Sequence, residues 1–287
     1  MTPAQPASAP LASARDVVRP LVQLVANVTV LTALLVYFGW RRSEAQSRRL
    51  GFAESVLQMS TRDYVLRSVG PVLALLVGVA VAGLLWVVLD RAVDEIDGRP
   101  PRSVRWALGS AWLVLPLLVL LLGYVAEPVA FVLFPASIAV GVLLLLYAVH
   151  LGRFGVRTDA EDGRRHMALQ LCTGLLAVVA VFWTANNYAY VEGVRFADEV
   201  RNDVTTLPAV RVYSAERLHL DAPGVREQRL AAAGDEEPAP LRYSGLRLLE
   251  STGGRLFLLS DEWTIRRGVL FVVDENAVRL EFVRGGG

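Results

Sequence analysis

The segment RYSGLRLLESTGGRLFLLSDEW, residues 242–263, contains two runs of strand-forming residues separated by two glycines. Gly253 and Gly254 allow the positive φ angles that a tight hairpin turn requires, so the segment predicts two antiparallel strands at 241–250 and 255–260. Such strands contrast with the preceding chain, which is dominated by long apolar runs. The segment therefore indicates a protein made of two parts with different character.

The residues on either side of this hairpin predict a small α+β domain at 191–287. Residues 191–204 repeat apolar side chains every three or four positions, which predicts an amphipathic helix that continues out of the last apolar run. Apolar and charged residues alternate over 278–282, so one side of this strand is expected to face a core. Further strands are predicted at 209–213 and 217–220, a surface loop at 230–240, and a second hairpin from 269–273 and 277–283.

The part before this domain, residues 20–190, is predicted to be a bundle of membrane-spanning helices. Hydrophobic residues make up 54% of the 287-residue chain, and about 20 apolar residues of helix cross a bilayer core. Glu127 and Pro128 alone separate the third and fourth runs, which predicts a tight helical hairpin because proline interrupts a helix. The five predicted spans are 20–40, 70–89, 106–126, 129–151 and 168–187, preceded by a disordered tail at 1–19. The predicted fold is thus a membrane α-helical bundle of about five transmembrane helices with a small C-terminal strand-rich α+β soluble domain.

Five spans place the two ends of the bundle on opposite sides of the membrane. Arginines are in small excess on the side of the N-terminus, and positive residues favour the cytoplasmic side. We therefore expect a multi-pass plasma-membrane protein with a cytoplasmic N-terminus and an extracytoplasmic C-terminal domain. The first span alone favours the opposite orientation, because more arginines follow it than precede it.

The loop between the first two spans, residues 41–69, is expected to pack on the C-terminal domain, which lies on the same side. The sequence Ser60-Thr61-Arg62-Asp63 is typical of a helix start. The loop also contains apolar residues that need cover from water: Leu50, Phe52, Val56, Leu57 and Met59. The alternative is that these residues form a surface for a partner protein.

Three short sequences resemble a known group of proteins. They are YFGW at 37–40, STRDYVLRSV at 60–69 and YSGLRLL at 243–249, the last followed by Trp263. Together they are similar to a family of uncharacterised multi-pass membrane proteins of GC-rich actinobacteria. The resemblance covers most of the chain and implies the same layout, but it implies no activity, because this family has none assigned.

The sequence predicts no catalytic residue, no cofactor and no metal site. It lacks a glycine-rich phosphate loop, an HExxH motif and any zinc-ligand spacing. His150 and His166 flank one loop and form a conceivable metal pair, but interfacial histidines explain them better. Asp90, Arg91, Asp94, Glu95 and Asp97 form a charged cluster that is more typical of a solvated loop than of a cation site. The net charge of +1 argues against a nucleic-acid partner, which requires a concentrated basic surface.

Polar residues inside the predicted spans are mild, and interhelical hydrogen bonds explain them. They are Gln23, Asn27, Thr29, Thr32, Ser110, Ser137, Gln170, Thr173, Thr184 and Asn186. Small residues four positions apart, Gly78 with Ala82 and Ser137 with Gly141, predict close helix contacts. Pro116 and Pro135 are expected to kink their helices.

Two functional hypotheses follow from this layout. The first is a non-enzymatic membrane protein that presents its strand-rich domain outside the cytoplasm to bind a partner or sense an envelope ligand. Its partners would be the lipid bilayer and other membrane or envelope proteins, or further copies of itself. The alternative is a subunit of an oligomeric channel or transporter gated by the C-terminal domain. The absence of charged residues inside the spans favours the first hypothesis.

Overall fold

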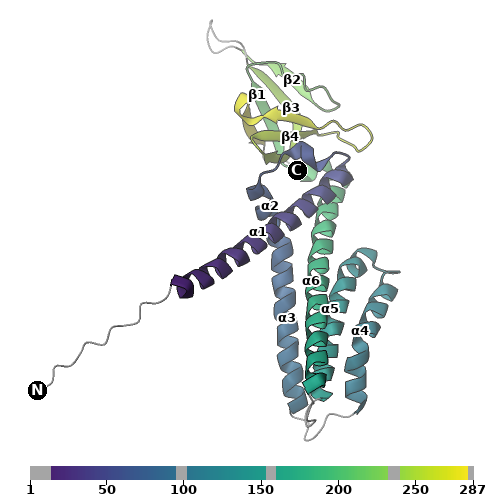
Figure 1. Ribbon diagram of the computed structural model, residues 1–287. Coiled ribbons are helices and arrows are strands. Elements are labelled where there is room, and N and C mark those ends of the chain that lie inside the picture. Colours follow the sequence, from purple (N-terminus) through teal and green to yellow (C-terminus); the bar gives the residue numbers. More distant parts are fainter. Residues whose placement is uncertain (1–13, 95–101, 153–159, 232–239, 284–287) are drawn as a thin grey trace, which may run out of the picture.

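The computed structural model describes residues 14–94, 102–152, 160–231 and 240–283, with helices first and an antiparallel sheet last (Figure 1). The helices are α1 (Ala14–Leu50), α2 (Thr61–Arg67), α3 (Val69–Asp94), α4 (Arg102–Leu122), α5 (Glu127–Gly152) and α6 (Ala160–Asn202), with short 3₁₀ turns η1 (Glu54–Leu57), η2 (Val204–Thr206) and η3 (Glu275–Ala277). The strands are β1 (Ala209–Ser214), β2 (Arg226–Arg229), β3 (Leu241–Thr252), β4 (Arg255–Ser260), β5 (Phe271–Asp274) and β6 (Arg279–Val283).

Three described helices contain segments long and apolar enough to cross a membrane, namely Val69–Val88, Glu127–Val149 and Leu171–Asn202. The apolar part of α4, Trp106–Leu122, is shorter. The predicted first span lies within α1, but the side chains of residues 14–27 are outside the described part, as are residues 1–13 of the predicted tail. Only 6% of the apolar segment in α3 is buried against other parts of the protein. The helical part therefore has a surface suited to lipid.

The predicted hairpin of the third and fourth apolar runs is present as α4 and α5, which pack along their length. A Cβ atom added at Gly141 would lie 2.5 Å from Trp112 Cα, so the two backbones meet where the Ser137 and Gly141 pair predicts a contact. The corresponding prediction for Gly78 is wrong within the described residues, because no atom lies within 4 Å of a Cβ added there. Small residues allow two helix backbones to come close together, but only where a neighbouring helix lies against them.

Pro135 lies inside α5 and has no N–H to donate to the carbonyl of Phe131 one turn earlier. Asn187 of α6 supplies the missing donor, since its Nδ2 lies 2.7 Å from Phe131 O. Asn186 Nδ2 donates to Asn187 Oδ1 at 3.3 Å, and Tyr37 Oη of α1 donates to Asn186 Oδ1 at 3.0 Å. A backbone group freed by proline is thus satisfied by a side chain from the neighbouring helix, as a lipid environment demands.

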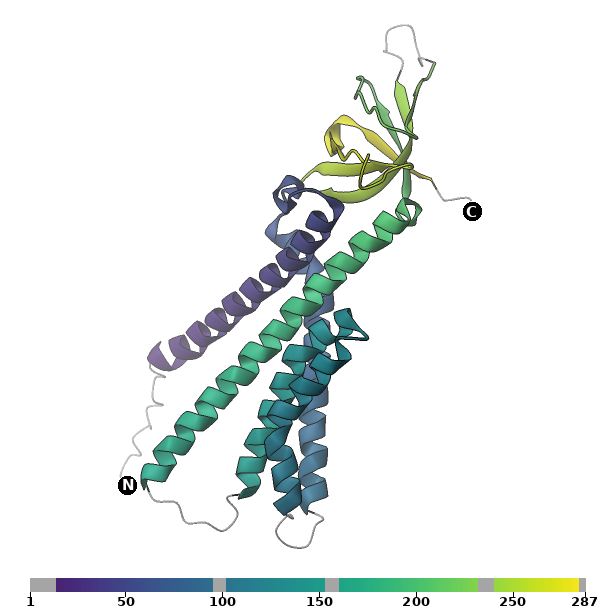
Figure 2. The same ribbon diagram turned by 90° about the vertical axis from the view of Figure 1, so that its right-hand side faces the viewer.

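Two helices continue past their apolar segments and reach the sheet, as Figure 2 shows for α1 and α6. We call residues 41–50 of α1 and 188–202 of α6 the stalk. At Gly193 an added Cβ would lie 2.2 Å from Arg42 O, so the two helices touch through their backbones. Arg49 Nε and Asp198 Oδ1 form an ion pair of 2.8 Å across the same contact. The predicted amphipathic extension at 191–204 is therefore confirmed as part of α6 and η2.

The sheet has the strand order β5-β4-β3-β1-β6, and β2 pairs with the start of β3 on the edge opposite to β1. The hairpin predicted at 242–263 is confirmed as β3 and β4, with φ of +61° at Gly253 and +72° at Gly254. The second predicted hairpin is wrong, because β5 pairs with β4 while β6 pairs with β1. β5 and β6 are at opposite ends of the strand order, yet both contribute to one apolar cluster. The sheet is therefore curved, and this cluster lies on its concave side.

The strand predicted at 217–220 is absent, and β2 was not foreseen. Leu218 and Leu220 instead pack as a covering segment on the concave apolar cluster. The amide of Leu218 donates to Tyr243 Oη at 2.9 Å. This amide is therefore not used for a backbone hydrogen bond to a neighbouring strand. Every residue of β2 is exposed, so this strand lacks the alternation of apolar and polar residues that marks a half-buried strand.

Prediction: the bond between Asn187 and the Phe131 carbonyl will be coupled to Pro135. Asn187→Leu leaves the carbonyl without a donor, whereas in a Pro135→Ala background the new backbone N–H can close the helical bond. The measured coupling, by unfolding of the purified protein in a double-mutant cycle, should be about 0.5–2 kcal/mol. Additive effects of the two substitutions would contradict this account of the bond.

Candidate functional site: the junction between helices and sheet

An apolar cluster joins the stalk to the sheet. Phe257 and Leu259 of β4 are 0% and 1% exposed and face the stalk, where Ala197 and Val200 are equally buried. Leu57 of η1, 1% exposed, fills the space between them. The prediction that the loop at 41–69 packs on the C-terminal domain is confirmed for its buried members; Val56 remains 39% exposed. This packing fixes the sheet on two helices and a loop at once.

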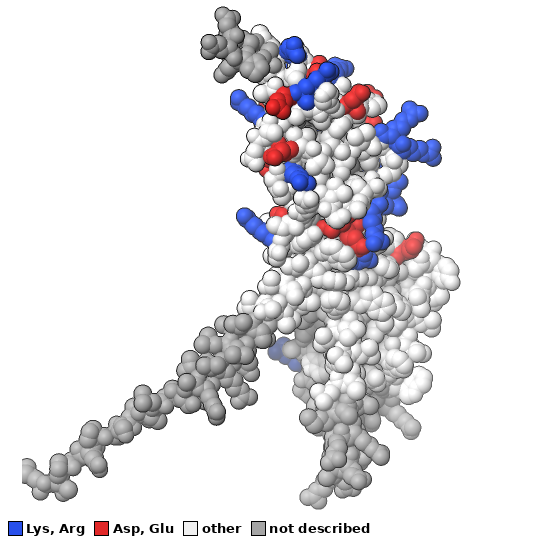
Figure 3. Space-filling model, turned by 45° about the horizontal axis from the view of Figure 1, so that its top comes forward, with Lys and Arg blue, Asp and Glu red and all other residues white. Residues whose placement is uncertain are grey.

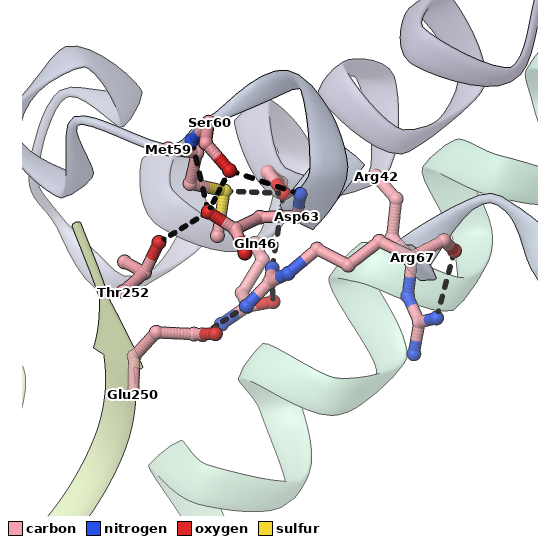
Figure 4. Close-up of polar contacts among 9 residues, drawn as sticks. Arg42, Gln46, Met59, Ser60, Asp63, Arg67, Glu250 and Thr252 are labelled. Atoms are coloured by element: carbon pink, nitrogen blue, oxygen red, sulfur yellow. Dashed lines mark hydrogen bonds and ion pairs between the residues drawn. The ribbon is translucent and has the colours of Figure 1, made fainter. Parts of the chain in front are cut away.

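The helix start predicted at Ser60 is confirmed as a capping box, and it also contacts the hairpin turn (Figure 4). One carboxylate oxygen, Asp63 Oδ2, accepts from Ser60 N at 2.9 Å, Ser60 Oγ at 2.8 Å and Thr252 Oγ1 at 2.9 Å. Burial alone would raise the pKa of Asp63, but the bonds from Ser60 and Thr252, with Arg67 nearby, hold it below its usual value. Asp63 is therefore a carboxylate at neutral pH.

The hairpin turn lies on the loop rather than projecting into solvent. Thr252 is only 6% exposed, and a Cβ added at Gly253 would lie 3.0 Å from Gln58 O. Gln58 itself has a positive φ of 47°, which is uncommon for a residue other than glycine. The segment that first indicated a strand-rich domain thus also attaches that domain to the helices.

Arg67 links three elements through its guanidinium (Figure 4). Its Nη1 donates to Ser43 Oγ at 2.9 Å and to Gln46 Oε1 at 3.1 Å, both on α1. Its Nη2 forms an ion pair with Glu250 of β3. Ser43 is fully buried and Gln46 is 4% exposed. Because buried polar groups cost free energy unless they are bonded, these partners fix the position of Arg67 and of the strand.

Further polar contacts surround this arginine. Arg42 Nη1 donates to Arg67 O at 3.3 Å, and Tyr64 Oη donates to the Glu54 carboxylate. Burial, followed by that bond, raises the pKa of Tyr64. Glu44, in the stalk, forms ion pairs of 2.6 Å with Arg41 and 2.7 Å with Arg48. The bonds of Arg42 and Tyr64 cross element boundaries, which suits a rigid coupling, whereas the ion pairs of Glu44 lie within α1.

The other residues singled out from the sequence are not among the described contacts of the junction. The side chains of His150, His166, Asp90, Asp94, Gln23, Asn27 and Gln170, and all of Glu95 and Asp97, are outside the described part. Thr32, Ser110, Ser137 and Thr184 donate to carbonyls of their own helices. Among the described residues no group of three His, Cys, Asp or Glu side chains is placed to hold a metal ion.

No family model, curated protein or solved structure matches the chain.

The residues of the junction were only partly foreseen. Arg67, Glu250 and Gln46 were not singled out, because each is an ordinary charged or polar residue until the fold brings them together. One signal was available in the sequence: Ser43, Gln46 and Leu50 recur every three or four residues after the first span. This spacing describes a helix face suited to packing.

Prediction: Arg67→Lys will destabilise the attachment of the sheet. A lysine ammonium cannot bond Ser43, Gln46 and Glu250 in the geometry of a planar guanidinium. We expect a loss of about 1–3 kcal/mol in unfolding of the purified protein, with faster hydrogen exchange in β3 and β4.

The matched control is Arg49→Lys, because Arg49 pairs with Asp198 on the same stalk but is 49% exposed. An exposed pair contributes at most about 1 kcal/mol, so this variant should leave exchange in the sheet unchanged. Equal effects of the two substitutions would show that Arg67 has no special role.

Proposed function

We propose that this protein is a multi-pass plasma-membrane protein that holds a strand-rich domain in a fixed position outside the cytoplasm for binding an envelope component. In this proposal the bundle crosses the membrane five times, with a cytoplasmic N-terminus. The protein acts by presenting a surface and not by catalysis. The resemblance to an actinobacterial family without assigned activity is compatible with this role.

The distribution of polarity supports membrane insertion. Charged side chains gather over the sheet and the adjoining helix ends, whereas the visible helical surface below them is uncharged over most of its area (Figure 3). The loop at 41–69, the turn between α4 and α5, and the sheet lie toward the same end of the helices (Figure 1). The small excess of arginines at the opposite end supports assigning that end to the cytoplasm.

The main support for the proposal is that α1 and α6 each run without interruption from an apolar segment into the core of the sheet domain. A domain that merely needed tethering would require only a flexible linker. Here two helices, a capped loop and a partly buried ion pair hold it instead. A fixed orientation matters when a surface must be presented at a set distance from the bilayer.

The alternative, a channel or transporter subunit gated by the domain, needs polar groups that line a path. Asn186, one of the polar residues noted in the spans, accepts a hydrogen bond from Tyr37, and its neighbour Asn187 donates to the Phe131 carbonyl. These bonds give both residues a structural role, so no described contact favours conduction over presentation.

Prediction: in a Cys172→Ser background, Arg266→Cys will react with a membrane-impermeant thiol reagent on intact cells. Arg266 is exposed in the connection between β4 and β5, so the reagent can reach it if the domain is outside. The matched variant is Ser103→Cys, an exposed position near the start of α4 at the opposite end of the bundle. It should react only after lysis.

The reverse pattern, with Ser103→Cys labelled on intact cells and Arg266→Cys protected, would overturn the proposed orientation. Labelling of both variants on intact cells would contradict the proposed number of crossings between them.

A further inference from the structure

The convex side of the curved sheet is covered over only part of its area. Over β4 and the end of β3, the stalk packs on Phe257, Leu259 and Leu249. Over β2, β1, β6 and the start of β3, the side chains on the same side are exposed or half-buried. The concave side of these strands is closed instead by the segment containing Leu218 and Leu220.

The strand register determines which side chains share this free area. Residues directly opposite each other in neighbouring strands point to the same side of a sheet. Tyr213 lies opposite both Arg242 and Arg279, Arg242 lies opposite Gln228, and Arg211 lies opposite Glu281. We call the outward side chains of these strands the arginine face; its charged members are Arg211, Arg226, Arg242, Arg279 and Glu281.

Charge is concentrated on this face beyond the average of the domain. Over residues 203–231 and 240–283 the domain has as many arginines as acidic residues, whereas the face has four arginines and one glutamate. Tyr213 Oη donates to Glu281 Oε2 at 2.6 Å, and Arg211 Nη1 lies 3.7 Å from the same oxygen. Arg226 and Arg279 are exposed and form no ion pair among the described residues.

The face is also ordered internally. Arg242 donates to Gln228 Oε1, and its Nε is buried without an acceptor. The hydrogen bond from Tyr213, with Arg211 and Arg242 nearby, lowers the pKa of Glu281. Arg242 and Arg279 lie on either side of Tyr213, two strand spacings or about 10 Å apart. Arginines held at a set spacing on a sheet are suited to repeated anionic groups, since each guanidinium can bind a carboxylate with two parallel bonds.

We propose that the arginine face binds an acidic polysaccharide whose carboxylates repeat along the chain. This deepens the proposed function and rests on it for the location of the ligand outside the cytoplasm. The four arginines bind successive carboxylates, and the ring of Tyr213 lies between them as a platform for a sugar ring.

The composition of the face favours a polysaccharide over a protein. Stable protein interfaces have an apolar centre filled by large side chains. The arginine face consists of arginine, glutamine, serine, glutamate and one tyrosine, with Ala209 and Val283 as aliphatic residues at one end. β2 lies at the end of the domain away from the helices (Figure 1), so this part of the face is far from the bilayer that the helices cross.

The test measures binding of the purified full-length protein to polygalacturonate, with neutral dextran and poly-glutamate as comparison probes. We expect salt-sensitive binding to polygalacturonate, none to dextran, and at least tenfold weaker binding to poly-glutamate. Arg226→Gln with Arg279→Gln should weaken polygalacturonate binding at least tenfold. Both side chains are exposed and without described ion pairs, so folding should be unaffected.

The matched control is Arg266→Gln with Arg267→Gln, which removes two exposed arginines elsewhere in the same domain. It should change the affinity less than twofold. Equal losses in the two double variants, no binding by the native protein, or equal affinity for poly-glutamate would each overturn the proposal. These outcomes are independent of membrane orientation, which the labelling experiment tests on cells.

Discussion

Phe257 and Leu259 project from the side of β4 that faces the helices, and both are at most 1% exposed. Leu256 and Leu258 of the same strand are equally buried on the opposite side. A strand buried on both sides needs two apolar partners, and the sheet supplies only one of them. The second is the stalk, which includes Leu50, together with Leu57 of η1. The sheet domain is therefore completed by the helices and is not an independent unit attached to them.

The polar contacts of the junction fix the orientation in which the sheet packs on the stalk. Apolar side chains tolerate small shifts, but hydrogen bonds lose strength steeply when distances and angles change. Arg67 contacts α1 and β3 together, and Asp63 contacts the loop and the hairpin turn. Any rotation of the sheet on the stalk would leave these nearly buried groups without partners. The same fixed orientation places the arginine face on the side of the sheet that also packs on the stalk.

The sequence was informative where structure depends on local pattern. The two glycines located the hairpin turn, Glu127 and Pro128 located the turn between α4 and α5, and Ser60 with Asp63 located a helix start. Each of these signals acts within a few residues. The strands that were misplaced depended on partners distant in the chain: β5 and β6 look like a hairpin locally, but β4 and β1 offer them longer apolar neighbours. Arg67 and Glu250 are 183 positions apart, so no local pattern can pair them.

The central claim is that the sheet has one fixed orientation on the stalk, and a distance distribution tests it most directly. Spin labels at Glu199→Cys on α6 and Val272→Cys on β5, both exposed positions, can be measured by double electron–electron resonance in a Cys172→Ser background. The account predicts one narrow distribution in lipid nanodiscs. A broad distribution or several separate distances would show that the domain moves freely on its helices, and would contradict the claim.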